Sequence, residues 1–211
     1  SFNATSSLLH VPVVSSVGCA ASVRYKQKSM ISLADIQAAR TQIGGTIYKS
    51  PCAYSEMLSH MTGARVLLKL DNLQMTGSFK ERGALNKLLS LSIDERQRGV
   101  IAASAGNHGL AVAFHAQRLG VPATIVMPRF APLVKVSWAR RYGAEVILAG
   151  MDFDEALAEG RRLEQEKGSI FIPAFNDPVV IAGQGTIGLE LLEQAPDLDA
   201  VLVPVGGGGM A

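Results

Sequence analysis

Regular alternation of short apolar segments with segments of helical periodicity is the feature that most restricts the fold of this sequence. From residue 99 onward, runs rich in Val, Ile, Leu and Ala predict strands, and a helical segment follows each run but the last. The predicted strands cover residues 99–103, 123–127, 145–148, 170–172 and 200–205, and the predicted helices cover residues 107–119, 132–142, 154–167 and 178–192. Strands that are apolar almost throughout are typical of a parallel sheet covered on both faces. The pattern therefore predicts a doubly wound α/β fold.

Further elements are predicted ahead of this alternation. A helix begins at Ser32, whose hydroxyl can accept a hydrogen bond from the first turn, and Asp35 lies in that turn. An apolar strand covers residues 66–70, and a second helix covers residues 79–89.

Two polar or glycine-rich segments directly follow predicted strands. The strand at 99–103 leads into Ser104, Ala105, Gly106 and Asn107, and the strand at 200–205 leads into Gly206, Gly207, Gly208 and Gly209. In open parallel sheets, ligands bind in the crevice beyond the carboxyl ends of the strands. Both segments are therefore candidate ligand-binding loops at one edge of the sheet.

Lys80 follows the turn Gly77-Ser78-Phe79 at the start of a predicted helix. A lysine amine reacts with an aldehyde only when it is partly deprotonated, and burial or a nearby cation lowers its pKa accordingly. Gly77 permits a close approach to a ligand, and Phe79 offers a flat apolar face beside the amine. A solvated helix lysine is the alternative for Lys80 taken alone, but its motif favours a reactive amine.

Asn107 and His108 open the helix that follows the first of these loops. The amide of Asn107 can donate a hydrogen bond to a phenolate-like oxygen, or it can cap the helix, and the two roles are compatible. Ser104, the backbone amides after it and His108 could hold a carboxylate at the N-terminus of the helix.

Consecutive glycines at 206–209 can adopt positive φ and present successive N–H groups to an anion. The loop lacks the Lys-Ser/Thr of a Walker loop and the spacing of a GxGxxG dinucleotide loop. Together with Lys80 and Asn107 it predicts a site for a phosphorylated aldehyde, with an amine, a polar loop beside the ring and amides for the phosphate.

These three segments resemble the threonine ammonia-lyase (threonine/serine dehydratase) family, whose members are pyridoxal-phosphate (PLP) enzymes of fold type II, similar to the tryptophan synthase beta subunit. The resemblance covers residues 31–211. The chain resembles the serine racemases slightly less, since they carry a serine in the position of Ala105. The resemblance therefore implies elimination rather than racemisation.

The fold implied by the resemblance has parallel sheets flanked by helices in a large domain, residues 30–75 and 153–211, with a smaller α/β domain inserted at 76–152. The implied catalytic residue is Lys80, which carries PLP. The implied cofactor-binding residues are Phe79, Lys80, Asn107, Gly206, Gly207, Gly208, Gly209 and Met210, and the implied substrate-binding residues are Ser104, Ala105, Gly106 and His108.

The implied reaction is a β-elimination that converts L-threonine or L-serine to a 2-oxo acid and ammonia. Lys80 removes the α-proton, the cofactor spreads the resulting charge, and the β-hydroxyl leaves. Catalytic domains of the family continue well past the glycine loop. The chain is therefore expected to be the N-terminal part of a larger, homo-oligomeric enzyme and to be inactive alone.

Two alternatives remain open at this point. A nucleotide-binding Rossmann-type module would grip a dinucleotide with residues 206–209, although the missing GxGxxG spacing and the lack of an acidic ribose partner count against it. A catalytically silent fragment is the other alternative.

Composition restricts the partners and the compartment. A formal net charge of +2 without a basic, aromatic-rich run argues against nucleic acid, and no apolar stretch is long enough to cross a membrane. Cys19 and Cys52 form no CxxC and have no histidine at ligand spacing, which predicts free thiols, a cytoplasmic location and no metal. Residues 1–29 lack Asp and Glu and are interpreted as an extension, or alternatively as an organellar targeting segment.

The remaining notable residues are given structural interpretations. Glu81 and Arg82 are interpreted as a surface or subunit-contact charge pair, and His115 as a residue on a helix face. The glycines of residues 181–188 are expected to let their helix pack closely on the sheet.

Overall fold

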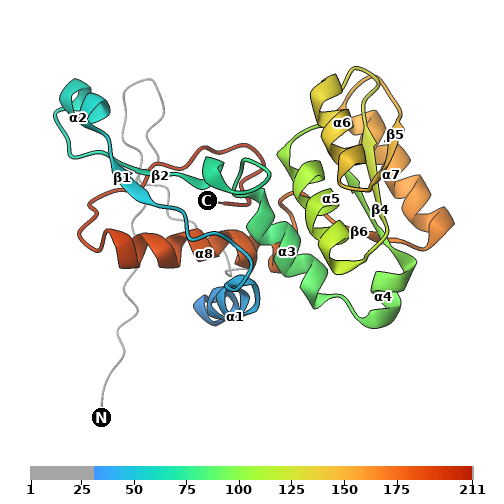
Figure 1. Cartoon of the computed structure of the whole chain (residues 1–211), viewed down its shortest axis with the longest axis horizontal. Helices are drawn as coiled ribbons and strands as arrows, with labels where there is room; N and C mark the ends of the chain where they lie inside the picture. Colours follow the sequence, from blue (N-terminus) through green and yellow to red (C-terminus); the bar gives the residue numbers. More distant parts are fainter. Residues whose placement is uncertain (1–30, 211) are drawn as a thin grey trace, which may run out of the picture.

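The computed structural model describes residues 31–210, so the predictions for residues 1–29 and for Cys19 lie outside the described residues. The helices are α1 (Leu33–Ile43), α2 (Glu56–Thr62), α3 (Lys80–Ser90), α4 (Ile93–Arg98), α5 (Asn107–Leu119), α6 (Leu133–Arg141), α7 (Phe153–Lys167) and α8 (Pro178–Gln194). The strands are β1 (Cys52–Tyr54), β2 (Leu67–Lys69), β3 (Val100–Ala103), β4 (Ala123–Met127), β5 (Glu145–Leu148) and β6 (Ile170–Phe171), and a 3-10 turn covers Asp71–Leu73. Figure 1 shows the course of the chain through them.

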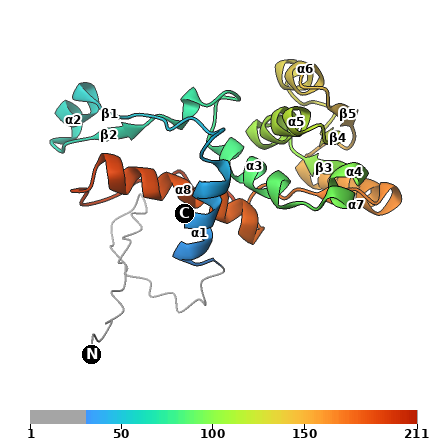
Figure 2. The same cartoon turned by 60° about the horizontal axis from the view of Figure 1, so that its bottom comes forward.

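A parallel sheet with the order β5-β4-β3-β6 lies between two layers of helices, which confirms the predicted α/β class. Helices α5 and α6 cover one face and α7 covers the other (Figure 2). Alternate residues of β3 serve the two cores: Ala102 packs toward α5, and Ile101 packs toward α7. Burial on both faces explains why the strands are apolar throughout.

Helices α1, α3 and α8 form a second packed group, in which α3 lies between α8 and α5 (Figure 1). The glycines of α8 serve this group, not the sheet, so the predicted packing partner was wrong. A Cβ at Gly183 would lie 2.6 Å from the carbonyl oxygen of Arg82, and one at Gly185 would lie 2.8 Å from Ile36 of α1. Small residues are needed there because the helix backbones approach so closely.

Arg82 is buried in this group, which corrects the prediction of a surface charge pair. Its guanidinium Nε and NH2 groups donate to Asp71 at 2.8 and 2.9 Å, and NH1 donates to Glu190 at 2.6 Å. Lys69 adds a second cation 2.5 Å from Glu190. Burial alone would raise the pKa of Asp71, but the hydrogen bonds and charge of Arg82 bring that pKa below its ordinary value. The positive charges of Arg82 and Lys69 therefore balance the negative charges of Asp71 and Glu190 in this buried network.

Glu81, the other member of the predicted surface pair, is also buried, beneath α5. Its carboxylate accepts a hydrogen bond from the backbone N–H of Thr76 and lies 3.3 Å from Nε2 of His115. His115, expected on a helix face, is only 1% exposed. Both residues lie on helices as predicted, but both are buried.

Two predicted strands differ in the structure. Residues 66–70 include β2, but β2 pairs antiparallel with β1 and stands outside the parallel sheet. Residues 200–205 form no strand, because no segment among residues 31–210 pairs with them. Leu202 is 93% exposed as a result.

The predicted domain boundaries stay a prediction. The parallel sheet continues past residue 152, because α7 leads into β6 and β6 pairs with β3. Within residues 31–210, no helix has both the length and the apolar character that crossing a membrane requires.

Candidate active site

The loop after β6, residues 172–177, links the three predicted motifs. Because β6 pairs with β3, this loop and the loop Ser104–Asn107 leave the sheet side by side at its carboxyl edge. Lys80 contacts the loop from α3, His108 contacts it from α5, and the glycine loop lies against Phe175. The structure therefore gathers all three motifs around one short segment.

Lys80 is the first residue of α3 and follows a turn in which Gly77 has a φ of 80°. This left-handed conformation favours glycine. The Nζ atom donates a hydrogen bond to the carbonyl oxygen of Ala174 at 2.7 Å and lies 5.2 Å from the centre of the Phe79 ring. Burial lowers the pKa of Lys80, since a half-buried ammonium loses part of its hydration. Within residues 31–210, Lys80 has no carboxylate partner.

Asn107 does not cap α5, so that alternative is wrong. Gly106 holds the N-cap position without a side-chain hydrogen bond, and Asn107 is the first helical residue. The Asn107 side chain is exposed at the sheet edge, where its Oδ1 atom accepts a hydrogen bond from Nζ of Lys135 at 2.8 Å. The amide is therefore available to a ligand.

The backbone of the Ser104 loop is held in shape by local contacts. The Ser104 hydroxyl oxygen accepts a hydrogen bond from the N–H of Gly106 at 3.2 Å. Gly109 lies so close to the loop that a Cβ there would be 2.7 Å from the carbonyl oxygen of Ser104. Ser104, Ala105 and Gly106 are half-buried, which leaves them accessible at the N-terminus of α5.

The side chain of His108 is buried against the start of the loop after β6. It is 3% exposed, and Nε2 donates to the carbonyl oxygen of Ile172 at 2.9 Å. A carbonyl only accepts, so Nε2 carries the proton and the buried Nδ1 is bare. Burial lowers the pKa of His108 to about 4, so the ring is neutral at pH 7. Only the backbone N–H of His108 can contribute to the predicted substrate site.

The depressed pKa of His108 predicts acid sensitivity. Between about pH 6.5 and pH 4, the imidazole of His108 takes up a proton in the unfolded chain but stays neutral in the folded protein. The free energy of unfolding is therefore highest above pH 6.5 and falls as the pH drops through this window. The free energy of unfolding should decrease by on the order of 3 kcal/mol over this window. Urea unfolding at several pH values measures it. His108→Gln keeps an N–H donor for Ile172 without a titrating ring, and an unchanged pH profile in this variant would contradict the assignment.

The glycine loop lies against Phe175. Gly208 has a φ of 79°, which a residue with a Cβ rarely adopts. A Cβ at Gly207 would overlap the Phe175 ring, and one at Gly209 would lie 2.7 Å from Cβ of Phe175. A Cβ at Gly206, in contrast, would meet nothing within 4 Å. Met210, the last described residue, is half-buried.

The loop after β6 was missed in the sequence, although the argument that placed Ser104 and Gly206 applies to it as well. Ala174 and Phe175 follow a predicted strand and precede a helix. The sequence gives no sign of a functional role for them, because neither side chain has a polar atom. Ala174 acts through its carbonyl oxygen, and Phe175 acts through its shape.

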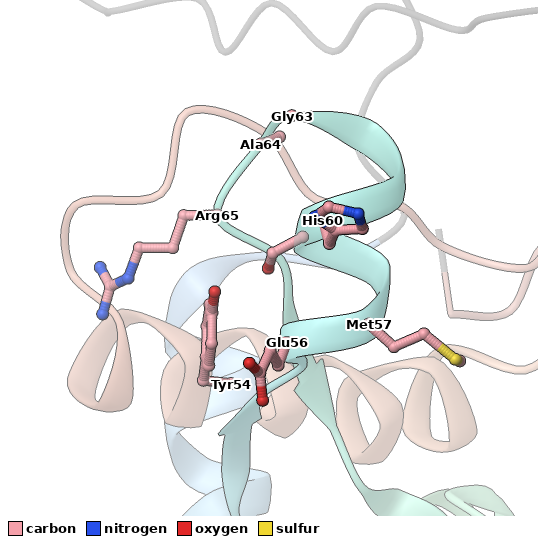
Figure 3. A pocket seen from close by; sticks show the side chains of 8 residues that line it. Tyr54, Glu56, Met57, His60, Gly63, Ala64 and Arg65 are labelled. Carbon is pink, nitrogen blue, oxygen red and sulfur yellow. The ribbon is translucent and has the colours of Figure 1, made fainter.

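A wide hollow lies elsewhere, between β1, α2 and the turn after α2. Figure 3 shows Tyr54 of β1, His60 of α2 and Arg65 around it. None of its lining residues belongs to the three motifs, and it is widely open. Within residues 31–210, no group of acidic, histidine or cysteine side chains could hold a metal ion.

The residues at the sheet edge fit a phosphorylated aldehyde. Lys80 is an amine with a lowered pKa, Asn107 is an exposed amide, and the glycine loop has open backbone at Gly206 and Gly208. The first-turn N–H groups of α5 can accept an anion beside them.

Comparison with known proteins agrees with this chemistry. The family described as "Pyridoxal-phosphate dependent enzyme" matches residues 43–211. The L-threonine ammonia-lyase of Thermotoga maritima is 55% identical over 181 residues, which are 86% of this chain and 45% of the relative. The catabolic L-threonine dehydratase of Escherichia coli is 45% identical over 180 residues, which are 85% of this chain and 55% of the relative. The chain thus spans about half the length of the curated relatives it matches.

Solved structures give the same result. Maize serine racemase superimposes with a TM-score of 0.83 at 35% identity, covering 86% of this chain and 55% of the racemase chain. Threonine deaminase isoform 2 of Solanum lycopersicum gives 0.80 at 44% identity, covering 84% of this chain and 48% of that chain. These matches favour the PLP interpretation over the nucleotide-binding alternative. The chain belongs to the pyridoxal-phosphate dependent enzyme family.

Proposed function

We propose that this protein uses PLP to deaminate L-threonine, and also L-serine, by β-elimination to a 2-oxo acid and ammonia. The observation that carries the proposal is Lys80, an amine with a lowered pKa that is held by the loop after β6, against which the glycine loop also lies. The similarity of the chain to threonine ammonia-lyases and dehydratases supports the proposed substrate and reaction.

Each cofactor contact is assigned to a motif. Lys80 would hold the aldehyde carbon, Asn107 would donate to the ring oxygen, and the backbone N–H groups from Gly206 to Gly209 would hold the phosphate. Phe79 lies beside Lys80 as an apolar face. Bound PLP supplies an electron sink for the charge that develops on the substrate.

The chain's own residues supply the proton transfer and the orientation. Lys80 would remove the proton from the substrate Cα, and burial lowers the pKa of its amine, which favours the neutral form that this step needs. The carbonyl oxygen of Ala174 directs the Nζ atom toward the edge of the sheet. The first-turn N–H groups of α5 and the Ser104 loop would orient the substrate carboxylate.

Turnover of L-threonine tests the function directly. The full-length enzyme that contains this chain, purified and incubated with PLP and L-threonine, should release 2-oxobutyrate and ammonia in equal amounts, and L-serine should give pyruvate. Product assays with and without added PLP measure this. Absence of both 2-oxo acids from a protein that demonstrably binds PLP would contradict the assigned reaction.

We further infer a homo-oligomeric, cytoplasmic protein. Exposed apolar side chains at Val201, Leu202 and Val205 support association with another surface. The free thiol of Cys52 is consistent with a reducing compartment. Light scattering of the purified protein tests the oligomer, and a monomer at all concentrations would contradict it.

Bulk in the glycine loop should weaken cofactor binding. Gly207→Val forces the loop away from Phe175, so its N–H groups lose their alignment, and the Kd for PLP should rise about tenfold or more. Gly206→Ala is the matched control, because its Cβ meets nothing. PLP titration of the two variants measures the difference, and equal affinities would indicate that the phosphate binds elsewhere.

Racemisation is the second candidate activity, favoured by the similarity to maize serine racemase. Ala105 offers no hydroxyl to return a proton to the substrate, so pyruvate from L-serine should exceed D-serine by about tenfold or more. Ala105→Ser should raise the racemised share. Chiral analysis of the products measures both, and abundant D-serine from the unmodified protein would contradict the preference for elimination.

A further inference from the structure

Lys135 stands at an unusual position for a cation. It lies in the first turn of α6, where the positive end of the helix dipole disfavours a lysine, and no acidic residue offsets it in that turn. Within residues 31–210, Lys135 forms no salt bridge. Neither helix formation nor ion pairing explains the residue.

The contact that Lys135 does make is with the candidate site. Its Nζ atom donates to Oδ1 of Asn107 at 2.8 Å, so the hydrogen bond joins the first turn of α6 to the first turn of α5. An ammonium group has donors only, and the atom that it meets must therefore be the amide oxygen. The hydrogen bond occupies the amide oxygen of Asn107, so its NH₂ group remains free to donate to a ligand.

We propose that Lys135 is a positioning residue that fixes the amide of Asn107 with its N–H groups toward the ring oxygen of PLP. The inference rests on the proposed function, since it assigns a role at the same site. The hydrogen bond from a charged donor polarises the amide and makes its N–H groups stronger donors. The lysine charge also favours a negative charge on the oxygen that Asn107 contacts.

A purely structural role for this hydrogen bond is disfavoured by the packing around it. Helix α6 is already anchored to the core beside α5 through Val136 and Ala139, which are buried. The Lys135–Asn107 bond, in contrast, is exposed, and exposed polar contacts contribute little to stability. Removing the lysine should therefore change ligand binding and leave stability unchanged.

The first test compares Lys135→Met with Arg140→Met. Arg140 is an exposed cation in the last turn of the same helix, at the end opposite to Lys135. Lys135→Met should raise the Kd for PLP about fivefold and weaken the visible absorption band of the bound cofactor, whose ring oxygen then retains its proton more readily. Its urea midpoint should match that of the unmodified protein. Arg140→Met should change none of these, and Lys135→Arg should restore most of the affinity.

The second test asks whether Lys135 acts through Asn107. In an Asn107→Ala background, Lys135→Met should have no further effect on the Kd or on the spectrum, because the group that it positions is absent. An equal loss in both backgrounds would overturn the proposal, and so would unchanged binding and spectrum in Lys135→Met. Failure of the unmodified protein to bind PLP would instead contradict the proposed function itself.

Discussion

Replacing Lys80 by alanine should abolish covalent PLP binding and lower the rate of threonine elimination by at least about 10³-fold. The variant loses both the amine that holds the aldehyde and the base that removes the α-proton. Lys87 and Lys135 also lie near this edge, but their amines donate to Asp177 and to Asn107, so neither takes the position of Lys80 on Ala174. The visible spectrum with PLP and the rate of 2-oxobutyrate release measure the two losses separately.

Two companion variants make this result specific. Lys80→Arg keeps the positive charge but cannot deprotonate, so it should be as inactive as the alanine variant. Lys49→Ala removes an exposed lysine that pairs with Glu193, and it should retain the spectrum and the rate. Retention of most elimination activity in either Lys80 variant would refute the assignment of the base.

Replacing Arg82 by methionine should lower the free energy of unfolding by about 3–5 kcal/mol. Arg82 is 1% exposed and donates to Asp71 and to Glu190. Without it, Lys69 is the remaining cation on Glu190, and Asp71 keeps only hydrogen bonds from Ser50 and Gln74. An uncompensated buried carboxylate is costly, because hydration cannot replace the lost partner. Urea unfolding measures the difference.

Arg162→Met is the matched control. Arg162 also contacts two carboxylates, those of Glu159 and Glu166, but its side chain is 59% exposed. Water and salt screen such pairs, so the urea midpoint should hardly move. Equal and small effects of the two substitutions would show that the buried network contributes little, and would contradict the importance assigned to Arg82.

The sequence was sufficient for the fold class and for the position of the Ser104 loop after its strand. Strand and helix patterns are local, and the parallel connectivity that they imply puts every loop after a strand at one edge. Ser104 and Lys80 reach that edge in the structure as expected.

Burial of charge was not predictable from local pattern. Arg82 and Glu81 are charged neighbours on a helix, a pattern that is typical of a solvated face. Whether such residues are buried depends on compensating groups elsewhere in the chain, and Glu190 lies 108 residues from Arg82. His115 is the corresponding partner beside Glu81.

The segment 200–205 shows another limit of the sequence. Its apolar residues suit a strand, but a strand also needs a neighbour to pair its backbone groups, and the described residues provide none. The role of Ala174 was hidden for a different reason, because its contact with Lys80 uses a backbone carbonyl that every residue possesses.

Mapping the lysine that binds the cofactor is the sharpest test of whether Lys80 holds the aldehyde of PLP. The purified protein is incubated with PLP, reduced with borohydride, digested and mapped by mass spectrometry. The account predicts that the reduced cofactor is attached to Lys80, in the peptide that contains Gly77-Ser78-Phe79. Attachment to another lysine, such as Lys135 at the same edge of the sheet, or the absence of any attachment, would contradict it.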